Sequence, residues 1–477
     1  MSARTPGLIL ALDQGGHGSR AVLFDETGSE LTEAHAPVAT RHGENGWVEQ
    51  DPLELLRSLH VAARDACDSP AATGRPVIAA GLATQRSTIV CWERSTGRAL
   101  TDAISWQDRR NAAWLEQLRP VEPEIRRLTG LVLSAHYGAS KLRWCLDHVP
   151  GVQLAARRGD LAFGPLASFL LARLLDERPS VADPANASRT LLYDPTRLDW
   201  SPPLLDTFGI DRSCLPACVP TRHAYGRMRV GARHIPLTAC TGDQSAAALA
   251  FGTPSQSVAL VNAGTGAFVQ RAVPAGAVLP DGLLCSVLRS DGVHATFSHE
   301  GTVNGAGSAV EWLGSRIALD VRRAIAVLDV GPSDRVPLFM NGVGGLGSPY
   351  WKADFPVEFV GEGSDAMKLA AVVESIAFLL CANLETMRRS APLDGIRISG
   401  GLASSDYLCQ SLADASRLPV DRHALREATA RGVAFLAAGE PAGWHAPPLE
   451  RAFVPRRNDP LAARHAAWLG EMARRGA

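Results

Sequence analysis

The sequence lacks the cysteine patterns that are typical of secreted disulfide-bonded proteins and of zinc-binding proteins. Its 477 residues hold nine scattered cysteines, an odd number, whereas a secreted disulfide framework needs an even set at close spacing. Cys214 and Cys218 are the closest pair, and no second pair or neighbouring histidine completes a zinc site. We therefore expect reduced, mostly buried thiols in a reducing compartment.

Long apolar runs and an excess of one charge are also missing. No apolar run reaches the roughly 18 residues that span a bilayer, and residues 8–12 are too few for the core of a signal peptide. The formal net charge of −1 does not favour a nucleic acid or a charged membrane surface as partner. We expect a cytoplasmic protein that binds neither.

What is present is the composition of a globular protein, with 46% hydrophobic and 20% charged residues. The length suggests two or three domains. Segments of helical period alternate with short apolar strands, which predicts an α/β architecture. The expected helices are 52–67, 111–118, 367–389, 405–415 and 462–475, and the expected strands are 8–13, 21–24, 77–84, 235–241, 257–262, 268–273 and 396–399.

A glycine-rich hairpin occurs once in each half of the chain. Residues 13–20 (DQGGHGSR) join two apolar strands, and residues 263–267 (AGTGA) do the same about 250 positions later. The recurrence suggests duplication of one domain type, although two unrelated hairpins would read the same way. We place the boundary near residue 250, which gives domains 1–250 and 251–477.

Three glycine-rich turns are candidates for binding phosphate. Glycines let the backbone approach an anion closely and point free N–H groups at its oxygens. The turns are 13–20, 263–267 and 399–404, and a plain hairpin is the alternative for each. The dinucleotide-binding and Walker A fingerprints are both absent in their usual form.

Asp13 ends the first expected strand, beside the first of these turns. A carboxylate next to a phosphate site is repulsive unless a cation bridges the two, which implies Mg²⁺; otherwise Asp13 only caps the turn. Arg20 on the returning strand is placed to bind a phosphate oxygen, or is a surface arginine.

Asp243 lies in TGDQSAAAL (241–249), where an expected strand gives way to a helix. Its carboxylate is able to take the proton of an attacking alcohol, with the amide of Gln244 beside it for a substrate hydroxyl. A helix N-cap is the alternative role. Arg86 and Trp106, from QRST (85–88) and WQDRR (106–110), fit a polyol site, or are an ion-pair partner and a core residue.

Together these residues resemble a known family, the FGGY carbohydrate kinases, and the first half is most similar to the glycerol kinases within it. The matching stretches follow one another through almost the whole chain. They are ALDQG (11–15), GWVEQDP (46–52), residues 84–110, TGLVL (129–133), KLRWCLDH (141–148), residues 186–200, TGDQSAAAL (241–249), NAGTGAF (262–268), GLGSPYW (345–351) and SGGLASSDYLCQ (399–410).

The resemblance implies two actin-like (ribonuclease H-like) α/β domains with a catalytic cleft between them. It implies ATP-dependent phosphorylation of a primary hydroxyl of a ketose or polyol, with the first domain mainly binding substrate and the second mainly binding nucleotide. Asp243 would be the base and Asp13 would organise Mg²⁺. The implied ATP-binding residues are Gly15, His17, Arg20, Gly264, Thr265, Gly266, Gly307, Glu311, Gly400, Gly401 and Ser405. The implied substrate-binding residues are Arg86, Ser87, Trp106, His136, Tyr137, Asp243 and Gln244.

The sequence departs from the family pattern at several of these positions. Gly16, His17 and Gly18 stand where the first turn usually carries hydroxyl residues. At the positions that Ser87 and His136 occupy here, glycerol kinases carry a glutamate and an aromatic residue. These changes favour an acceptor other than glycerol.

Two alternatives to the kinase stay open. One is a non-catalytic sugar-binding protein on the same scaffold, and the other is a polymerising actin-like ATPase. The resemblance also leaves homodimer and homotetramer open.

Overall fold

The computed structural model describes residues 7–331 and 335–477, and the chain divides into two compact units. The first unit comprises Met1–Thr253, Cys285–Phe297 and Glu427–Ala446, and the second comprises the three stretches between and after these. The first crossing, after Thr253, lies close to the position at which we divided the sequence. The two later returns to the first unit have no local sequence signal.

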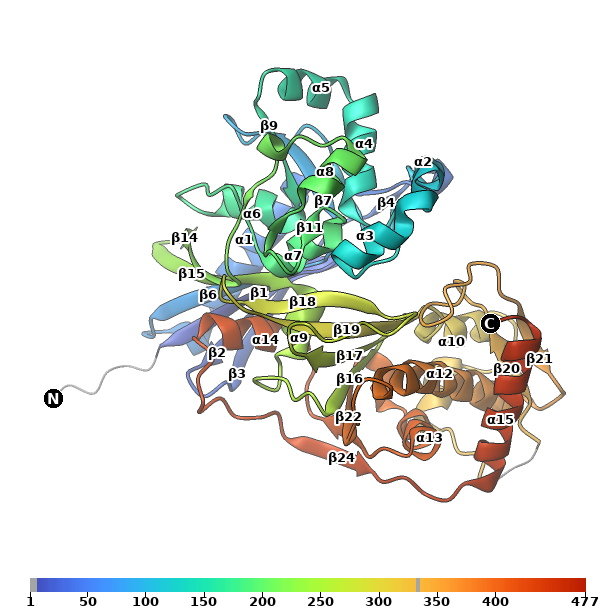
Figure 1. Cartoon of the computed structure of the whole chain (residues 1–477). Coiled ribbons are helices and arrows are strands. Elements are labelled where there is room, and N and C mark those ends of the chain that lie inside the picture. Colours follow the sequence, from blue (N-terminus) through green and yellow to red (C-terminus); the bar gives the residue numbers. More distant parts are fainter. Residues whose placement is uncertain (1–6, 332–334) are drawn as a thin grey trace. The chain divides into compact units, whose positions relative to one another are not determined.

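A six-stranded sheet is the centre of the first unit (Figure 1). Its strand order is β14-β15-β6-β1-β2-β3, with β1 antiparallel to β2 and parallel to β6. The strands are β1 (Leu8–Gln14), β2 (Gly18–Asp25), β3 (Glu30–Pro37), β6 (Val77–Thr84), β14 (Arg222–Val230) and β15 (Arg233–Gly242).

Both faces of this sheet are buried, which explains why β1 reads as a continuous apolar run. Leu8, Leu10 and Leu12 join one core with residues of α1 (Pro52–Cys67). Ile9 and Ala11 point the other way, into a core with residues of α14 (Ala428–Ala437). Successive side chains of a strand face opposite sides, so a strand covered on both sides needs apolar residues at every position.

A second, five-stranded sheet and several helices complete the first unit. The sheet has the order β4-β5-β8-β7-β9. Its strands are β4 (Arg41–His42), β5 (Val48–Gln50), β7 (Ile89–Glu93), β8 (Ala103–Ile104) and β9 (Leu161–Pro165), and two short ladders pair β10 (Val181–Ala182) with β13 (Ala217–Cys218) and β11 (Tyr193–Asp194) with β12 (Asp199–Trp200). The remaining helices are α2 (Ala112–Leu115), α3 (Glu122–Thr129), α4 (Gly138–His148), α5 (Pro150–Arg157), α6 (Leu166–Leu174), α7 (Pro184–Ala187), α8 (Pro202–Phe208) and α9 (Asp243–Ala248).

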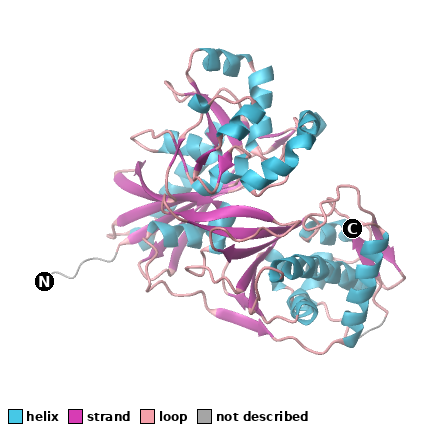
Figure 2. Ribbon diagram, viewed as in Figure 1, coloured by secondary structure: helices cyan, strands magenta, loops and turns pink. Residues whose placement is uncertain are grey.

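The second unit is also mixed α/β (Figure 2). Five of its strands lie in the order β17-β16-β22-β23-β24, and β20 pairs with β21. The strands are β16 (Val258–Ala263), β17 (Ala267–Val273), β20 (Leu338–Asn341), β21 (Val357–Val360), β22 (Gly395–Ser399), β23 (Val420–His423) and β24 (Leu449–Phe453), while β18 (Leu284–Ser290) and β19 (Ala295–Val303) each cross the boundary between the units. The helices are α10 (Gly307–Gly314), α11 (Val321–Ala324), α12 (Asp365–Arg388), α13 (Asp406–Ser416) and α15 (Asp459–Arg474).

The glycine-rich hairpin recurs in the same topological setting. In the first unit β1 pairs antiparallel with β2 and parallel with β6. In the second unit β16 pairs antiparallel with β17 and parallel with β22. The two hairpins therefore start equivalent arrangements, as the duplicated sequence pattern suggested.

Most expected elements form within one or two residues of the expected bounds, while β2 and α15 (Asp459–Arg474) each begin three residues earlier and one helix differs more. The helix expected over 111–118 ends early, because α2 stops at Leu115 and the chain tightens into a 3-10 helix, η3 (Glu116–Val121), with Pro120 inside it. Proline lacks the N–H that a continuing α-helix needs. The nine cysteines are all free, as expected.

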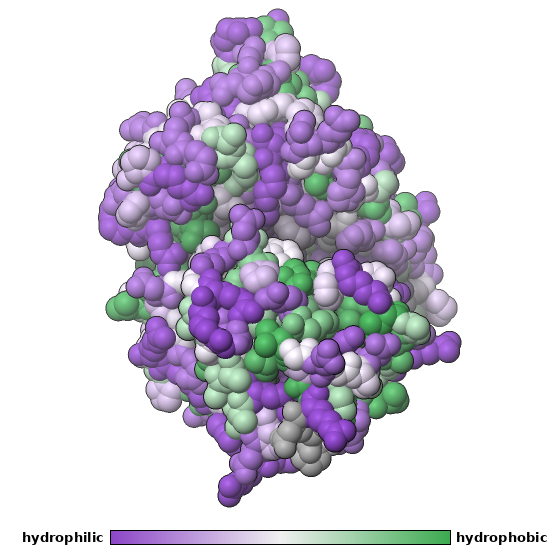
Figure 3. Space-filling model, turned by 90° about the vertical axis from the view of Figure 1, so that its right-hand side faces the viewer, coloured by the Kyte–Doolittle hydropathy of each residue, from purple (hydrophilic) through white to green (hydrophobic). Residues whose placement is uncertain are grey.

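One helix of the second unit has the length and composition of a membrane span, although charged residues interrupt its apolar run. Among the described residues, α12 is long and apolar enough to cross a membrane, and 83% of its most apolar window is buried inside the protein. Its side chains form the main core of the second unit with β16 and β22, so α12 is a core helix of that unit. On the face drawn in Figure 3, apolar side chains lie in patches among hydrophilic ones.

A buried histidine in the second unit makes stability depend on pH. His299 on β19 is fully buried, and neither ring nitrogen has a hydrogen-bond partner among the described residues. Burial, together with the charge of Arg271, lowers the pKa of His299 to about 4. Between about pH 6.5 and 4, His299 therefore binds a proton in the unfolded chain and not in the folded chain. The free energy of unfolding decreases as the pH falls through this window.

Replacing His299 by leucine is expected to remove this loss. Between pH 8 and pH 5 the free energy of unfolding of the wild type should fall by about 2 kcal/mol relative to His299→Leu. Urea unfolding across that range measures the difference. The matched control is His294→Leu, an exposed histidine just before the same strand. A gap between wild type and His299→Leu that does not change with pH would contradict the prediction.

Candidate active site

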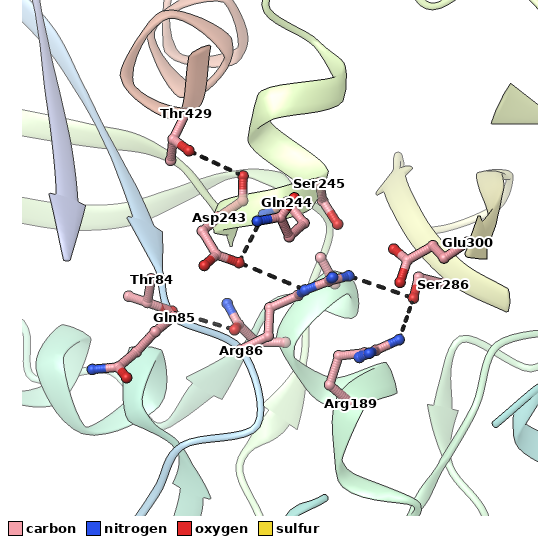
Figure 4. A network of polar contacts seen from close by, with 12 residues as sticks. Thr84, Gln85, Arg86, Arg189, Asp243, Gln244, Ser245, Ser286, Glu300 and Thr429 are labelled. Carbon is pink, nitrogen blue, oxygen red and sulfur yellow. Dashed lines mark hydrogen bonds and ion pairs between the residues drawn. The ribbon is translucent and has the colours of Figure 1, made fainter. Parts of the chain in front are cut away.

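Asp243 stands where β15 gives way to α9, in the first unit. It is the first residue of the helix, and Gly242 occupies the N-cap, so the plain N-cap role does not apply. One carboxylate oxygen accepts the backbone N–H of Gln244 at 2.7 Å. The carboxylate also lies 3.6 Å from the guanidinium of Arg86. Asp243 is thus a half-buried carboxylate with a cation beside it, at the positive end of a short helix (Figure 4).

Arg86 continues this contact into a chain of polar groups. Its guanidinium donates to the hydroxyl of Ser286 at 3.5 Å, and Arg189 donates to the same hydroxyl at 2.8 Å (Figure 4). All three side chains are buried. A Cβ at Gly242 would lie 2.6 Å from Arg86, so the glycine before Asp243 makes room for this arginine. Arg86 is therefore part of the site and not the surface ion-pair partner that the sequence also allowed.

Ser87 follows Arg86 in an unusual backbone conformation. Its φ of 64° lies in the left-handed region, which side chains other than glycine rarely adopt. The residue is buried, and its hydroxyl has no hydrogen-bond partner among the described residues. Thr88 then donates to Gln85 and accepts the backbone N–H of Trp106 at 3.1 Å. The QRST turn thereby fixes the backbone of the half-buried Trp106.

His136 and Tyr137 lie next to Trp106. The ring centroid of His136 is 5.8 Å from that of Trp106 and 4.9 Å from that of Tyr137. Arg189 lies over the ring of Tyr137 at 5.2 Å. Burial lowers the pKa of His136 well below its usual range, and nearby cations, Arg189 first among them, add to the effect. His136 is therefore neutral at pH 7, with one ring nitrogen able to donate and the other able to accept.

Asp13 lies within β1, one residue before its end. Burial, and then the charges of Asp243 and Glu427, raise the pKa of Asp13 to about 7, although Arg20 opposes them. Arg20 forms ion pairs with Glu33 at 2.8 Å and with Glu427. Burial and repulsion between these carboxylates disfavour the charged form of Asp13, and a bound cation would relieve that repulsion. Asp13 is therefore suited to organise a metal ion.

No cluster of three or more metal-ligating side chains occurs within residues 7–331 and 335–477. A magnesium ion does not require one. Mg²⁺ keeps several waters and is commonly held through one or two carboxylates together with substrate phosphates. Asp13 alone is therefore compatible with this mode of binding.

The first glycine-rich turn is closed by its own backbone. Gly15 donates to the carbonyl of Gly18 at 2.9 Å, and His17 at the tip is exposed. A Cβ at Gly16 would meet nothing within 4 Å, whereas one at Gly18 would lie 2.4 Å from His35 on β3. The departure from the family pattern at Gly18 thus has a steric reason, and the turn leaves open space at Gly16.

Three glutamines tie this turn to the acceptor end of the site. The side chain of Gln85 donates to Gln14 at 3.1 Å and to Gln50 at 2.8 Å. Gln50 donates in turn to the carbonyl of Gly16 at 2.8 Å. The three amides form a buried link between the end of β1, the first turn and the QRST turn.

The second set of predicted residues lies wholly in the second unit, beginning with the turn 263–267. Gly264 donates to the carbonyl of Gly266 at 2.8 Å, and Gly307 at the start of α10 donates to the carbonyl of Gly264 at 2.9 Å. A Cβ at Gly307 would lie 2.7 Å from that carbonyl oxygen. Thr265 is exposed at the tip, and its carbonyl accepts Ser308. The turn and the helix start therefore pack backbone to backbone, through N–H groups that are bonded to carbonyls of the chain.

The remaining nucleotide candidates surround the third turn and α10. Gly400 has a φ of 92°, and a Cβ there would lie 2.5 Å from the carbonyl oxygen of Ala263, so only glycine fits. Gly401 faces open space. The hydroxyl of Ser405 is used as the N-cap of α13, and exposed Glu311 pairs with Arg322 at 3.1 Å. Their roles toward a nucleotide stay predictions.

Four residues of the site were missed by sequence reasoning. Lys141, which donates to the backbone carbonyls of Ser87 and His136, and Arg189 stand in stretches that carried the family resemblance, so their positions were visible but their roles were not. Ser286 and Glu427 belong to the segments that return to the first unit, and no local pattern marks them.

Comparisons with known proteins bear on the family of the chain. Two family models match the chain: the N-terminal domain of the FGGY family of carbohydrate kinases over residues 8–250, and its C-terminal domain over residues 259–439. A glycerol kinase of Polaromonas sp. is 36% identical over 449 residues, which is 90% of each chain.

Solved structures extend the likeness to the fold. The glycerol kinase of Plasmodium falciparum with ADP superposes with a TM-score of 0.90 at 23% identity over 99% of each chain. A xylulose kinase of Lactobacillus acidophilus gives a TM-score of 0.85 at 17% identity over 98% of each chain. The fold class expected from the sequence, two actin-like α/β domains, is confirmed.

Proposed function

The chain belongs to the FGGY family of carbohydrate kinases, and on that premise we propose that it transfers the γ-phosphoryl group of ATP to a primary hydroxyl of a ketose or polyol, with Asp243 as the general base. One observation carries this assignment. Asp243 stands at the head of α9 beside the buried guanidinium of Arg86, with the amide of Gln244 next to it.

The groups around Asp243 support binding of a hydroxylated acceptor. The Oε1 atom of Gln244 is buried and has no partner among the described residues, so it is able to accept a hydrogen bond from a substrate hydroxyl. The buried hydroxyl of Ser87 is likewise unpartnered in that part of the chain. Trp106 and His136 add aromatic surface against which the C–H face of a sugar packs. Asp243 then removes the proton of the hydroxyl that attacks phosphorus.

Asp13 is the residue that would organise Mg²⁺. When bound, the ion would supply positive charge that neutralises the phosphates during transfer. Asp13 lies among carboxylates whose repulsion, together with burial, raises its pKa to about 7, and a divalent cation relieves that repulsion. Arg20 is the guanidinium available in the same place, once its ion pair with Glu427 opens toward a phosphate oxygen.

The glycine turns support the binding of a triphosphate. A Cβ at Gly16 or Gly401 would meet nothing within 4 Å, and one at Gly264 would meet only the carbonyl oxygen of Gly266 at 3.8 Å, so a polyphosphate is able to approach the backbone there without meeting a side chain. Gly307 begins α10, and the dipole of this helix favours an anion near its N-terminus. We assign the first turn and the turn at 264–266 to the phosphates, and the turn at 400–401 to the adenosine.

The acceptor is best tested directly. A coupled ADP-release screen should cover pentuloses, hexuloses, tetritols, pentitols and glycerol, with ATP and Mg²⁺ in excess. The proposal expects turnover with at least one acceptor. Absence of turnover with every acceptor, in protein that ATP does stabilise against heat in the presence of Mg²⁺, would overturn it. That outcome is the one expected of a non-catalytic protein, an alternative that the comparisons do not support.

Position 87 is expected to discriminate against glycerol. A short serine leaves no carboxylate to accept the hydroxyls of a three-carbon acceptor, so Ser87→Glu should raise kcat/KM for glycerol by about tenfold, the scale of one hydrogen bond to a charged group. Steady-state kinetics with glycerol measures the change. Ser87→Gln, with the same length and no charge, is the control. Equal effects of both variants, or no gain with glutamate, would show that other positions exclude glycerol.

A further inference from the structure

We propose that Lys141 is a positioning residue for the acceptor end of the site. It holds two separate loops in place through their backbone carbonyls, one at Ser87 and one at His136. The inference rests on the proposed function, because that proposal assigns Ser87 and His136 to acceptor binding. No motif or pairing in the sequence gave Lys141 a role.

The contacts of Lys141 are specific and enclosed. Its ammonium nitrogen Nζ lies 2.9 Å from the carbonyl oxygen of Ser87 and 2.7 Å from that of His136, and it donates to both. The side chain is 1% exposed and is among the largest fully buried side chains of the chain. The two carbonyls are 49 positions apart in sequence, so this single side chain is a direct link between the loops.

The location of Lys141 is costly for a cation, which argues against a passive role. It is the fourth residue of α4, within the first turn, where the helix dipole disfavours positive charge. Burial lowers the pKa of Lys141 well below its usual range; Asp108 opposes this effect, and Arg109 and Arg110 add to it. A buried amine in such surroundings persists when its donors satisfy acceptors that would otherwise be left without partners.

The acceptor at Ser87 explains what Lys141 does. Ser87 has a φ of 64°, a strained conformation for any residue except glycine, and such strain persists only where surrounding contacts enforce it. Its carbonyl points into the ammonium of Lys141. With the backbone fixed in this way, the Ser87 hydroxyl and the Arg86 guanidinium are each directed by a rigid turn. The backbone of His136 is fixed in the same way, because its carbonyl also accepts a hydrogen bond from Lys141.

The test combines removal of the ammonium with relief of the strain. Lys141→Met, close in length but without donors, should raise the KM for the acceptor by about tenfold and leave the KM for ATP within about twofold. Glycine adopts a φ of 64° without strain. The same Lys141→Met change made in a Ser87→Gly background should therefore cost less than about threefold in acceptor KM, a non-additivity that marks direct coupling. The acceptors are D-xylulose, xylitol, erythritol and glycerol.

Two further variants guard against loss of folding. Lys368→Met is the matched control, because Lys368 is the fourth residue of α12 and has no such carbonyl contacts among those described; it should leave both KM values unchanged. Lys141→Gln keeps one donor group and should fall between wild type and Lys141→Met. Hydrogen exchange of peptides covering 85–90 and 134–138 should speed up in Lys141→Met and not in the control.

The outcomes distinguish a failure of the role proposed for Lys141 from a failure of the proposed function. Equal rises in both KM values without relief by Ser87→Gly would mean general destabilisation, and would overturn the role of Lys141. An unchanged acceptor KM with unchanged exchange would do the same. If the wild type turns over none of the four acceptors, exchange alone decides on Lys141, while the broader screen decides on the proposed function.

Discussion

Replacement of Asp243 by asparagine is expected to lower kcat by a factor of about 10² to 10⁴, the range of general-base catalysis. Asparagine keeps the size and shape of the side chain and is able to keep the contact with the N–H of Gln244. It cannot take the proton of the attacking hydroxyl. Acceptor binding should persist, because Arg86, Gln244 and Ser87 are untouched. Single-turnover ADP release with the acceptor identified in the screen measures the loss.

The control for this variant is Asp365→Asn. Asp365 is the first residue of α12, as Asp243 is of α9, so the change removes a carboxylate from an equivalent helix position in the second unit. It should leave turnover unchanged. The thermal midpoints of both variants should stay close to that of the wild type. Normal turnover of Asp243→Asn would remove this residue from the mechanism.

Replacement of Gly432 by alanine is expected to destabilise the first unit strongly and to displace Asp243. Gly432 lies in α14, where the backbone of α9 comes so close that an added Cβ would lie 1.7 Å from the carbonyl oxygen of Ala246. The neighbouring atom is backbone and cannot swing away. Overpacking of this kind costs about 3 kcal/mol or more.

The displaced element is the one that carries the base. α9 begins at Asp243, and the hydroxyl of Thr429 on α14 donates to the carbonyl of Asp243 at 3.4 Å. A shift of α9 by about 1 Å is enough to lower turnover by about a hundredfold. Urea unfolding and ADP release on the same preparation measure both effects. We expect a lower unfolding midpoint together with a lower kcat.

Gly443→Ala is the matched control for this prediction. It lies 11 residues further along the same returning segment, and a Cβ there would meet nothing within 4 Å. Its stability should stay within about 0.5 kcal/mol of wild type. A Gly432→Ala protein with wild-type stability and turnover would show that the two helices move apart at little cost, and would contradict the packing argument.

Local sequence patterns were sufficient for the elements and for the family. The apolar period of β1 and α1, the glycines between paired strands and the ordered family stretches depend on neighbouring residues, and each formed where expected. The candidate residues Asp13 and Asp243 were named for the same reason, because a strand end or a helix start is a local signal, and Arg86 was named as a charged group suited to a polyol. The contacts between these residues could not be predicted from their spacing in the sequence.

The tertiary structure alone decided which charges and backbones meet. Glu427 reaches Arg20 from 407 positions away, and Ser286 joins Arg86 to Arg189, because two late segments return to the first unit. The need for Gly18 and Gly432 likewise comes from a neighbour distant in sequence, His35 on the adjacent strand and Ala246 on the facing helix. The sequence by itself determined the secondary-structure elements and the family of this chain, since both depend on short-range patterns. Long-range packing determined the partners of each functional group, since close contact and burial depend on the folded chain as a whole.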